Sequence, residues 1–278
     1  MGHPLSAKLL ANLPALCNMV RRIAVQAGDI TLDYYEMGNL NVETKGDGSP
    51  VSLADQKAEE YIAKELASIT PDIPMVGEES KEAGKMPNLS QGEYFWLVDP
   101  LDGTKEFIQG GSDFTVNIAL IKGDTPVMGV VFVPVTGVLY AGHAAGSAIR
   151  WSEETDQDKS IHVRSAPKNG LTVVASKSHG DNERMEKLLE SFKINKLMRR
   201  GSSLKICAIA EGKADLYPRL GPTCEWDTAA AHAVLNAAGG CLVQTDGTAF
   251  TYGHTERDML NPEFIAASEN WFLEDDAE

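Results

Sequence analysis

Residues 95–108 read FWLVDPLDGTKEFI, a stretch in which four apolar residues run directly into two carboxylates three residues apart, Asp99 and Asp102. The run FWLV is typical of a buried strand. Taken singly, each acid has an ordinary structural explanation, because Asp-Pro and Asp-Gly are turn dipeptides. Taken together at the end of a buried strand, the two acids need partners, since buried carboxylates are seldom left unpaired.

The residues between and after these acids suggest what the partners are. Pro100 restricts the backbone so that the Leu101 carbonyl can point the same way as the two carboxylates. Gly103 and Thr104 allow a helix to begin, with its free amides and positive dipole end facing the same spot. Carboxylates and a carbonyl are the oxygen ligands that Mg²⁺ takes, whereas amides suit an anion. The stretch therefore predicts a site for a phosphate bridged to magnesium.

The composition is that of an ordinary globular protein of one large domain or two sub-domains, with 278 residues, 43% of them hydrophobic and 23% charged. A net charge of −15 argues against nucleic acid polymers as partners. Four dispersed cysteines and six histidines show neither disulfide nor zinc spacing, which favours a reducing cytoplasm. The first 30 residues contain Asn, two Arg and an Asp among their apolar positions, and no stretch of 18 apolar residues occurs in the sequence, so neither a signal peptide nor an integral membrane span is predicted.

Two patterns of secondary structure divide the chain. Helices are predicted over 16–34 and from Ser52 to Ile69, followed by strands at 74–80, 94–99, 114–121, 127–135 and 137–142. The polar stretch 152–160 reads as a connection. Beyond it strands and helices alternate, which is typical of α/β layering. We therefore expect an α+β sub-domain at 1–155, carrying most of the metal ligands, and an α/β sub-domain at 156–278.

Further oxygen ligands are available elsewhere, each with a structural alternative. Glu78 and Glu79 follow the strand-like PMVG and could equally form a solvated acidic loop. Asp227 precedes an Ala-rich helix and could serve as its N-cap or first-turn acid. Asp55 lies in Ser52-x-x-Asp55, a capping-box pattern, and the residue pattern alone assigns it to the helix end.

Other catalytic machinery is missing from the sequence. It contains neither a G-x-x-x-x-G-K-[ST] loop, nor a G-x-G-x-x-G motif after a strand, nor a G-x-S-x-G elbow. DPLDGT superficially resembles the Asp-x-Asp-Gly-Thr motif of haloacid dehalogenase phosphatases. The nucleophilic Asp of that motif would fall at Pro100, which excludes their covalent mechanism.

Three motifs carry a family resemblance. GEES (77–80), WLVDPLDGTKEF (96–107) and EWDTAAAHAVLNAAGG (225–240), in this order and at these distances, resemble the inositol monophosphatase superfamily of Mg²⁺-dependent, lithium-sensitive phosphatases. LADQKAEEYI (53–62) and GSSLKICAIAEGKADLYPR (201–219) extend the resemblance over nearly the whole chain. It implies a layered α-β-α-β-α sandwich of mixed α/β (α+β) class. DGTKEF, ASKSH and LYPRLGPTCEWDTAAAHAV are most similar to the bacterial 3'(2'),5'-bisphosphate nucleotidases linked to sulfate assimilation.

The resemblance also implies roles for individual residues. The metal ligands, for two or three Mg²⁺, would be Glu78, Asp99, the Leu101 carbonyl, Asp102 and Asp227, with Glu79 close behind them. Asp55 and Thr104 would orient and deprotonate the attacking water. The amides of Gly103 and Thr104 would contact the scissile phosphate. The nucleotide and its second phosphate would be held by His179, Ser202, Lys205 and Arg219.

The implied reaction is hydrolysis of the 3'-phosphate of 3'-phosphoadenosine 5'-phosphate, and of the corresponding phosphosulfate, to AMP and phosphate. The substrate would thus be a small phosphorylated nucleotide, and lithium would inhibit. The alternative within the superfamily is an inositol or sugar phosphatase, and the alternative of another class is a catalytically silent metal or nucleotide sensor. The expected location is cytoplasmic; peripheral association with the inner face of the cell membrane and the oligomeric state stay open.

Overall fold

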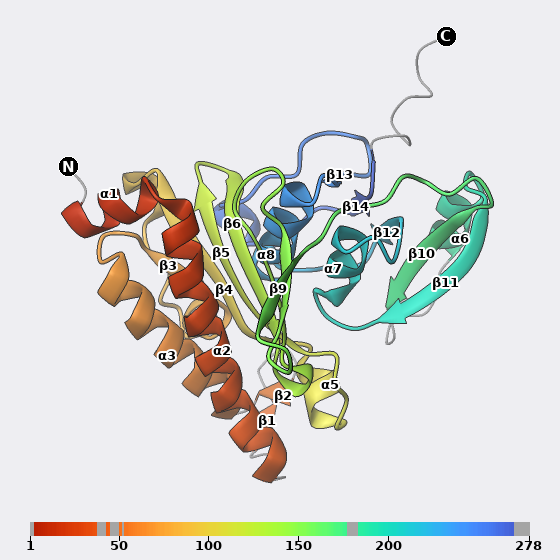
Figure 1. Cartoon of the computed structure of the whole chain (residues 1–278). Helices are drawn as coiled ribbons and strands as arrows, with labels where there is room; N and C mark the ends of the chain where they lie inside the picture. Colours follow the sequence, from red (N-terminus) through yellow and green to blue (C-terminus); the bar gives the residue numbers. More distant parts are fainter. Residues whose placement is uncertain (1–2, 38–42, 45–49, 52, 177–182, 270–278) are drawn as a thin grey trace.

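The computed structural model describes residues 3–37, 43–44, 50–51, 53–176 and 183–269. Its elements form two large sheets, a two-stranded ribbon and three helical layers (Figure 1). The first two helices are α1 (Pro4–Leu10) and α2 (Leu13–Met37), so the predicted first helix has a separate short helix before it. A two-stranded ribbon, β1 (Glu43–Thr44) with β2 (Pro50–Val51), leads to α3 (Leu53–Ile69).

A seven-stranded sheet occupies the centre of the first half, with its strands in the order β3-β4-β5-β6-β7-β8-β9. All neighbours are antiparallel except β3 and β4. The bounds of the strands are Met75–Gly77, Tyr94–Asp102, Thr115–Lys122, Thr125–Val133, Val138–Gly142, Ile149–Ser152 and Gln157–Ser160. The prediction that 152–160 is merely a connection is wrong, because β8 and β9 form a hairpin at the sheet edge.

Both faces of this sheet are covered by helices. In β4, Trp96 and Val98 face α2 and α3, whereas Phe95 and Leu97 face the opposite way, toward the centre of the molecule. Successive side chains of a strand point to opposite faces, so a strand buried on both sides needs an unbroken apolar run. FWLV is therefore apolar at every position because two helical layers enclose it.

The second sheet has the order β11-β10-β12-β14-β13 and mixes parallel with antiparallel pairs. Its strands, in chain order, are Leu171–Ser176 (β10), Ile194–Arg200 (β11), Leu216–Arg219 (β12), Cys241–Gln244 (β13) and Phe264–Ala267 (β14). On its outer face, Leu188 and Leu189 of α6 (Glu183–Leu189) pack against Leu171, Val173 and Leu216. The helix and this sheet form the last two layers.

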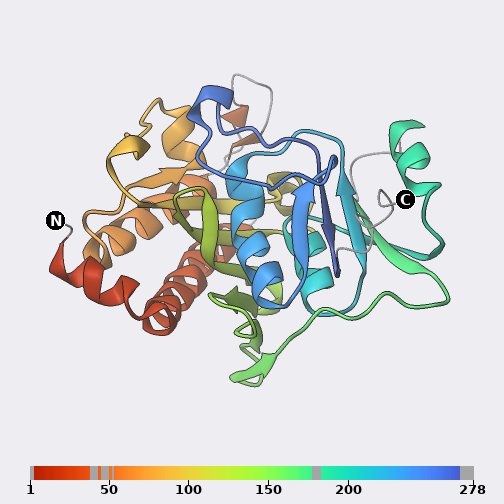
Figure 2. The same ribbon diagram turned by 90° about the horizontal axis from the view of Figure 1, so that it is seen from above.

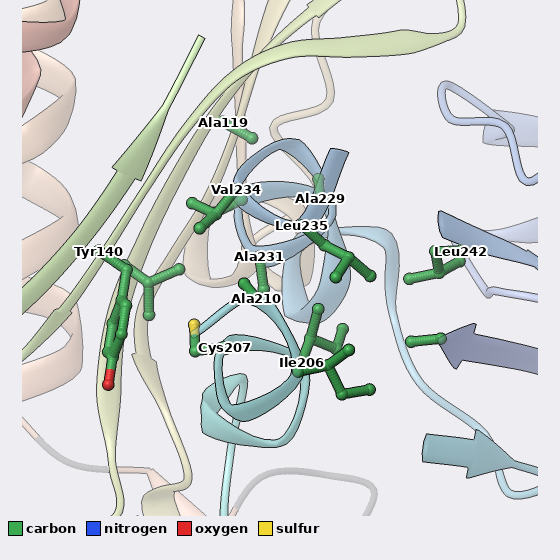
Figure 3. Packing of buried hydrophobic residues seen from close by; sticks show 14 of the residues in the cluster. Ala119, Tyr140, Ile206, Cys207, Ala210, Ala229, Ala231, Val234, Leu235 and Leu242 are labelled. Atoms are coloured by element: carbon green, nitrogen blue, oxygen red, sulfur yellow. The ribbon is translucent and has the colours of Figure 1, made fainter. Parts of the chain in front are cut away.

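Helices α7 (Leu204–Ala210) and α8 (Glu225–Ala237) fill the space between the two sheets (Figure 2). Figure 3 shows Cys207 and Ala210 of α7 beside Ala231 of α8, with Tyr140 on one side and Leu242 on the other. Small side chains at this contact let the two helices approach closely. The layers thus run α-β-α-β-α, which confirms the fold class expected from the sequence. Within the described residues, no helix is both long and apolar enough to cross a membrane.

Candidate metal centre

Asp99 and Asp102 lie at an irregularity in strand β4. Asp99 pairs with Asn117 and Asp102 with Thr115, so β4 has one residue more than β5 between these two pairs. Pro100 lies within this bulge, where the strand tolerates its missing N–H group. The Leu101 amide donates a hydrogen bond to Asp99 Oδ1 over 3.0 Å. The bulge therefore turns the end of a buried strand into a segment that brings both carboxylates to one site.

The turn after Asp102 depends on Gly103. Gly103 has φ +96° and serves as N-cap of α5 (Thr104–Ile108), as the sequence predicts for a helix start here. A β-carbon at Gly103 would lie 3.0 Å from the Asp113 carbonyl oxygen, so both the conformation and the space call for glycine. Thr104 Oγ1 donates to the Leu101 carbonyl over 3.3 Å. The hydroxyl thus lies beside the one main-chain carbonyl among the predicted ligands.

Asp227 reaches the same site from helix α8. It occupies the first turn, and its Oδ2 accepts a hydrogen bond from the Cys224 amide over 2.9 Å, completing a capping box. The prediction that Asp227 is a first-turn acid of the helix is therefore correct. This hydrogen bond engages only one of its two carboxylate oxygens. Ligand oxygens of Asp99, Asp102 and Asp227 all lie within 4.8 Å of one another. One cation can contact all three carboxylates at such separations.

Glu78 and Glu79 open a short helix rather than a loop. Strand β3 ends at Gly77 and α4 (Glu78–Glu82) begins with the two acids in its first turn. The Glu59 carboxylate accepts hydrogen bonds from the Glu79 amide (2.8 Å) and the Ser80 amide (2.7 Å). A β-carbon at Gly77 would lie 2.4 Å from Glu59 Cδ. Glu59, which the sequence analysis did not single out, therefore fixes the turn that carries Glu78.

The charges at this site oppose one another in the absence of a cation. Burial raises the pKa of Asp99 well above its usual range, and the negative charges of Glu78, Asp102, Asp227 and Asp55 raise it further. Burial likewise raises the pKa of Asp227, with Asp102 and Glu78 adding to the effect. A divalent cation reverses this repulsion, and an all-oxygen donor set is what Mg²⁺ accepts. The residues present therefore fit a magnesium site.

Asp55 lies in the first turn of α3 and is almost fully buried, at 1% exposure. It is close enough to Asp99 for its charge to raise the pKa of that carboxyl. A position in the first turn of a helix is what the sequence predicted. Its approach to the acidic cluster is compatible with the catalytic role that the resemblance implies. Ser52, the predicted cap of this helix, lies outside the described residues.

A cavity of about 280 Å³ opens next to the carboxylates. The predicted residues along it are Glu78, Asp102, Gly103, Thr104, Ser202, Lys205, Arg219 and Asp227. The Lys205 ammonium donates to the Ser202 carbonyl over 2.6 Å and lies 5.6 Å from the centre of the Tyr217 ring. Burial lowers the pKa of Lys205 to about 8. Arg219 donates to the carbonyls of Gly221 (3.1 Å) and Pro222 (2.9 Å).

The cavity is therefore lined both by acids and by the cations Lys205 and Arg219, an arrangement suited to a substrate with more than one phosphate. Of the four residues predicted to hold the nucleotide, Ser202, Lys205 and Arg219 lie together along it. His179 lies outside the described residues.

The site and fold have a counterpart in a known family. The sequence model of the inositol monophosphatase family matches residues 15–276. The chain belongs to this family. The 3'(2'),5'-bisphosphate nucleotidase CysQ of Escherichia coli O157:H7 is 43% identical over 250 residues, which cover 90% of the chain and 98% of that protein. CysQ of Buchnera aphidicola is 38% identical, with 92% and 93% covered.

A solved structure agrees with these relatives. CysQ from Bacteroides thetaiotaomicron, described as a bacterial member of the inositol monophosphatase family, superimposes with a TM-score of 0.77 at 37% identity. The superposition covers 91% of this chain and 97% of that one. Membership of this enzyme family confirms the resemblance predicted from GEES, WLVDPLDGTKEF and EWDTAAAHAVLNAAGG.

Four polar residues behind Asp102 were missed by the sequence analysis or assigned elsewhere. Asp102 Oδ2 accepts hydrogen bonds from Ser202 Oγ (2.6 Å) and the Ser203 amide (2.7 Å). Asn117 Nδ2 lies 3.4 Å from the same oxygen, and Thr115 Oγ1 lies 2.5 Å from Ser202 Oγ. For Thr115 and Asn117 the available signal was their polarity within the apolar strand FTVNIALI, where both are buried.

Proposed function

We propose that the protein is a Mg²⁺-dependent 3'(2'),5'-bisphosphate nucleotidase. Its reaction is hydrolysis of the 3'-phosphate of 3'-phosphoadenosine 5'-phosphate, and of the corresponding phosphosulfate, to AMP and phosphate. The observation that carries this proposal is that one cavity is lined both by Asp102 and Asp227 and by Lys205 and Arg219. The names of the relatives from Escherichia coli and Buchnera aphidicola support the same reaction.

The carboxylates of Glu78, Asp99, Asp102 and Asp227 and the carbonyl of Leu101 would hold two or three magnesium ions. The ions, when bound, supply Lewis acidity to the phosphoryl oxygens, lower the pKa of water and neutralise the leaving oxygen. An acidic protein can in this way accept a polyanionic substrate. The raised pKa of Asp99 and of Asp227, both caused by burial and by neighbouring carboxylates, supports a cation at this position.

Thr104 and Asp55 would act on the attacking water. The Thr104 hydroxyl accepts a hydrogen bond from the water, and the Asp55 carboxylate takes up a proton through that hydroxyl. The water oxygen attacks phosphorus in line with the ester bond, and the P–O3' bond breaks. The departing oxygen takes a proton from solvent water to become the 3'-hydroxyl of AMP, and Asp55 returns its proton to solvent. No phosphoenzyme is needed, consistent with proline at position 100.

Different residues of the cavity would contact the scissile phosphate and the rest of the nucleotide. The amides of Gly103 and Thr104 orient the scissile phosphate, and Lys205 and Arg219, with Ser202 and His179, hold the nucleotide and its second phosphate. We further propose that residues 1–155 form the sub-domain with most metal ligands and that residues 156–278 contribute Asp227 and the nucleotide contacts. Hydrolysis then requires the two sub-domains to be correctly joined.

A substrate panel tests this function. Phosphate release is measured with Mg²⁺ from 3'-phosphoadenosine 5'-phosphate, the phosphosulfate, myo-inositol 1-phosphate and fructose 1,6-bisphosphate. We expect the highest kcat/KM for the bisphosphorylated nucleotide and inhibition by Li⁺. Preference for inositol 1-phosphate or fructose 1,6-bisphosphate would favour the inositol or sugar phosphatase instead. The absence of Mg²⁺-dependent turnover with all four compounds would favour a silent sensor.

A further inference from the structure

Ser203 joins two metal-ligand segments that come from different layers of the fold. It is buried, at 3% exposure, and immediately precedes helix α7. Its amide donates to Asp102 Oδ2 over 2.7 Å, and its hydroxyl donates to the main-chain carbonyl of Asp227 over 2.7 Å. One residue thus bonds both to a carboxylate at the end of β4 and to the first turn of α8. Neither bond involves the other three predicted ligands, Glu78, Asp99 and the Leu101 carbonyl.

Asn117 of β5 holds this arrangement from behind. It is 1% exposed, and its Nδ2 donates to Ser203 Oγ over 2.9 Å and lies 3.4 Å from Asp102 Oδ2. Its Oδ1 accepts a hydrogen bond from Thr115 Oγ1 over 3.0 Å, which fixes the orientation of the amide. The Ser203 hydroxyl therefore both accepts and donates. A buried network in which each member is satisfied in this way is rigid, because a shift of one group leaves another unpaired.

The two carboxylate oxygens of Asp102 have different surroundings. Oδ2 receives Ser202 Oγ and the Ser203 amide, whereas no described residue donates a hydrogen bond to Oδ1. Ser202 makes its contact from a left-handed backbone conformation, with φ +52°, which is costly for a residue other than glycine. Oδ1 is consequently the oxygen of Asp102 that is available to a cation.

We infer that Ser203 and Asn117 are positioning residues that hold Asp102 and Asp227 at the spacing a divalent cation requires. This inference rests on the metal site in the proposed function. Mg²⁺ tolerates little departure from octahedral geometry, so small shifts of one carboxylate weaken its binding. Residues that orient metal ligands typically change affinity by about 10- to 100-fold when they are replaced. Ser202, whose hydroxyl donates to Asp102 Oδ2, thereby helps to orient this carboxylate in addition to contacting the nucleotide.

Direct titration with Mn²⁺, followed by electron paramagnetic resonance, tests this role without relying on turnover. The variants are Ser203→Ala and Asn117→Ala. The matched control is Thr70→Val, which removes a fully buried hydroxyl that bonds to the Leu66 carbonyl and Trp96 Nε1, away from the carboxylates. We expect about 10-fold weaker Mn²⁺ binding in both site variants. Thr70→Val should lower Tm and leave Mn²⁺ affinity as in the wild type.

Kinetics supply a second readout. In both site variants the Mg²⁺ concentration for half-maximal rate should rise about 10-fold, while KM for the nucleotide at saturating Mg²⁺ changes less than about twofold. The double variant should lose less than the two single losses combined, because the residues act as one unit. Wild-type Mn²⁺ affinity in whichever of the two variants folds would overturn the inference and leave the metal site standing. Failure of the wild type to bind Mn²⁺ would overturn the proposed function itself.

Discussion

The carboxylates of Asp99 and Asp227, one in the bulge of β4 and the other in the first turn of α8, approach within 4.8 Å of each other. The two elements belong to different layers, so packing of the whole fold forces this proximity. Repulsion between the buried charges opposes folding of the metal-free protein. Binding of a cation converts the same proximity into an attraction, which links stability to metal.

Asp99→Asn should stabilise the metal-free protein and inactivate the enzyme. The pKa of Asp99 is raised in the folded state, so between its usual value and the raised one the folded protein binds more protons than the unfolded chain. Stability contributed by this group is therefore lost as pH rises through that window. We expect Tm in EDTA to fall as pH rises above the usual pKa range of an aspartate for the wild type, and less steeply for Asp99→Asn. Calorimetry with and without Mg²⁺ checks this; equal slopes for both proteins would contradict it.

The carboxylate cluster could be predicted from sequence because its signals are local. Asp99, Pro100, Asp102 and Gly103 are adjacent in the chain, and turn chemistry and ligand chemistry can be read together there. The place of Asp227 before an Ala-rich helix predicted only a capping or first-turn acid, and its role as a ligand was predicted from the family resemblance. That these carboxylates lie close together in space was predicted only from the family resemblance. In the structure their ligand oxygens lie within 4.8 Å of one another.

Other features depend on tertiary neighbours and had no local signal. Glu59, Asn117 and Ser203 are ordinary polar residues until the fold brings them against α4, Asp102 and α8. Strands β9 (QDKS) and β11 (INKLMRR) were missed because both are edge strands. Edge strands commonly carry charged residues, which hide the alternation that marks a strand.

Glu59→Gln should weaken the metal site through Glu78. The Glu59 carboxylate accepts from the Glu79 amide, the Ser80 amide and the Ser80 hydroxyl, and glutamine has only one acceptor oxygen for them. We expect the Mg²⁺ concentration for half-maximal rate to rise about 10-fold. Glu60→Gln is the matched control, since Glu60 is exposed and pairs with Lys57. Equal Mg²⁺ dependence of the two variants would exclude this role for Glu59.

Thr104→Val should lower kcat by about 100-fold or more, because loss of a group that handles the water proton typically costs 10²- to 10⁴-fold. Valine keeps the shape of threonine but lacks the hydroxyl that lies 3.3 Å from the Leu101 carbonyl. Thr104→Ser, which retains the hydroxyl, is the control and should recover most of the rate. Steady-state phosphate release at saturating Mg²⁺ measures both. If serine is as damaging as valine, the hydroxyl is not the important group.

Lys205 should give the reaction an alkaline limit. Because burial lowers its pKa to about 8, the ammonium loses its charge as pH rises through that value. The neutral amine attracts phosphate less, so kcat/KM for the nucleotide should fall above about pH 8. Lys205→Met should be about 10-fold slower at pH 7 and lack this limb, since a charged hydrogen bond is lost. Lys213→Met, on the exposed surface, should follow the wild-type profile. An unchanged alkaline limb in Lys205→Met would contradict the assignment.

Magnesium-dependent hydrolysis at the carboxylate site is tested most directly by phosphate release from 3'-phosphoadenosine 5'-phosphate, measured for the wild type and for Asp102→Asn. Asparagine has the shape of aspartate and keeps an oxygen that can accept the Ser203 amide, so the variant should fold. We expect rapid release by the wild type only when Mg²⁺ is present, and a loss of about 100-fold or more in the folded variant. Wild-type turnover by Asp102→Asn, or equal rates with and without Mg²⁺, would contradict it.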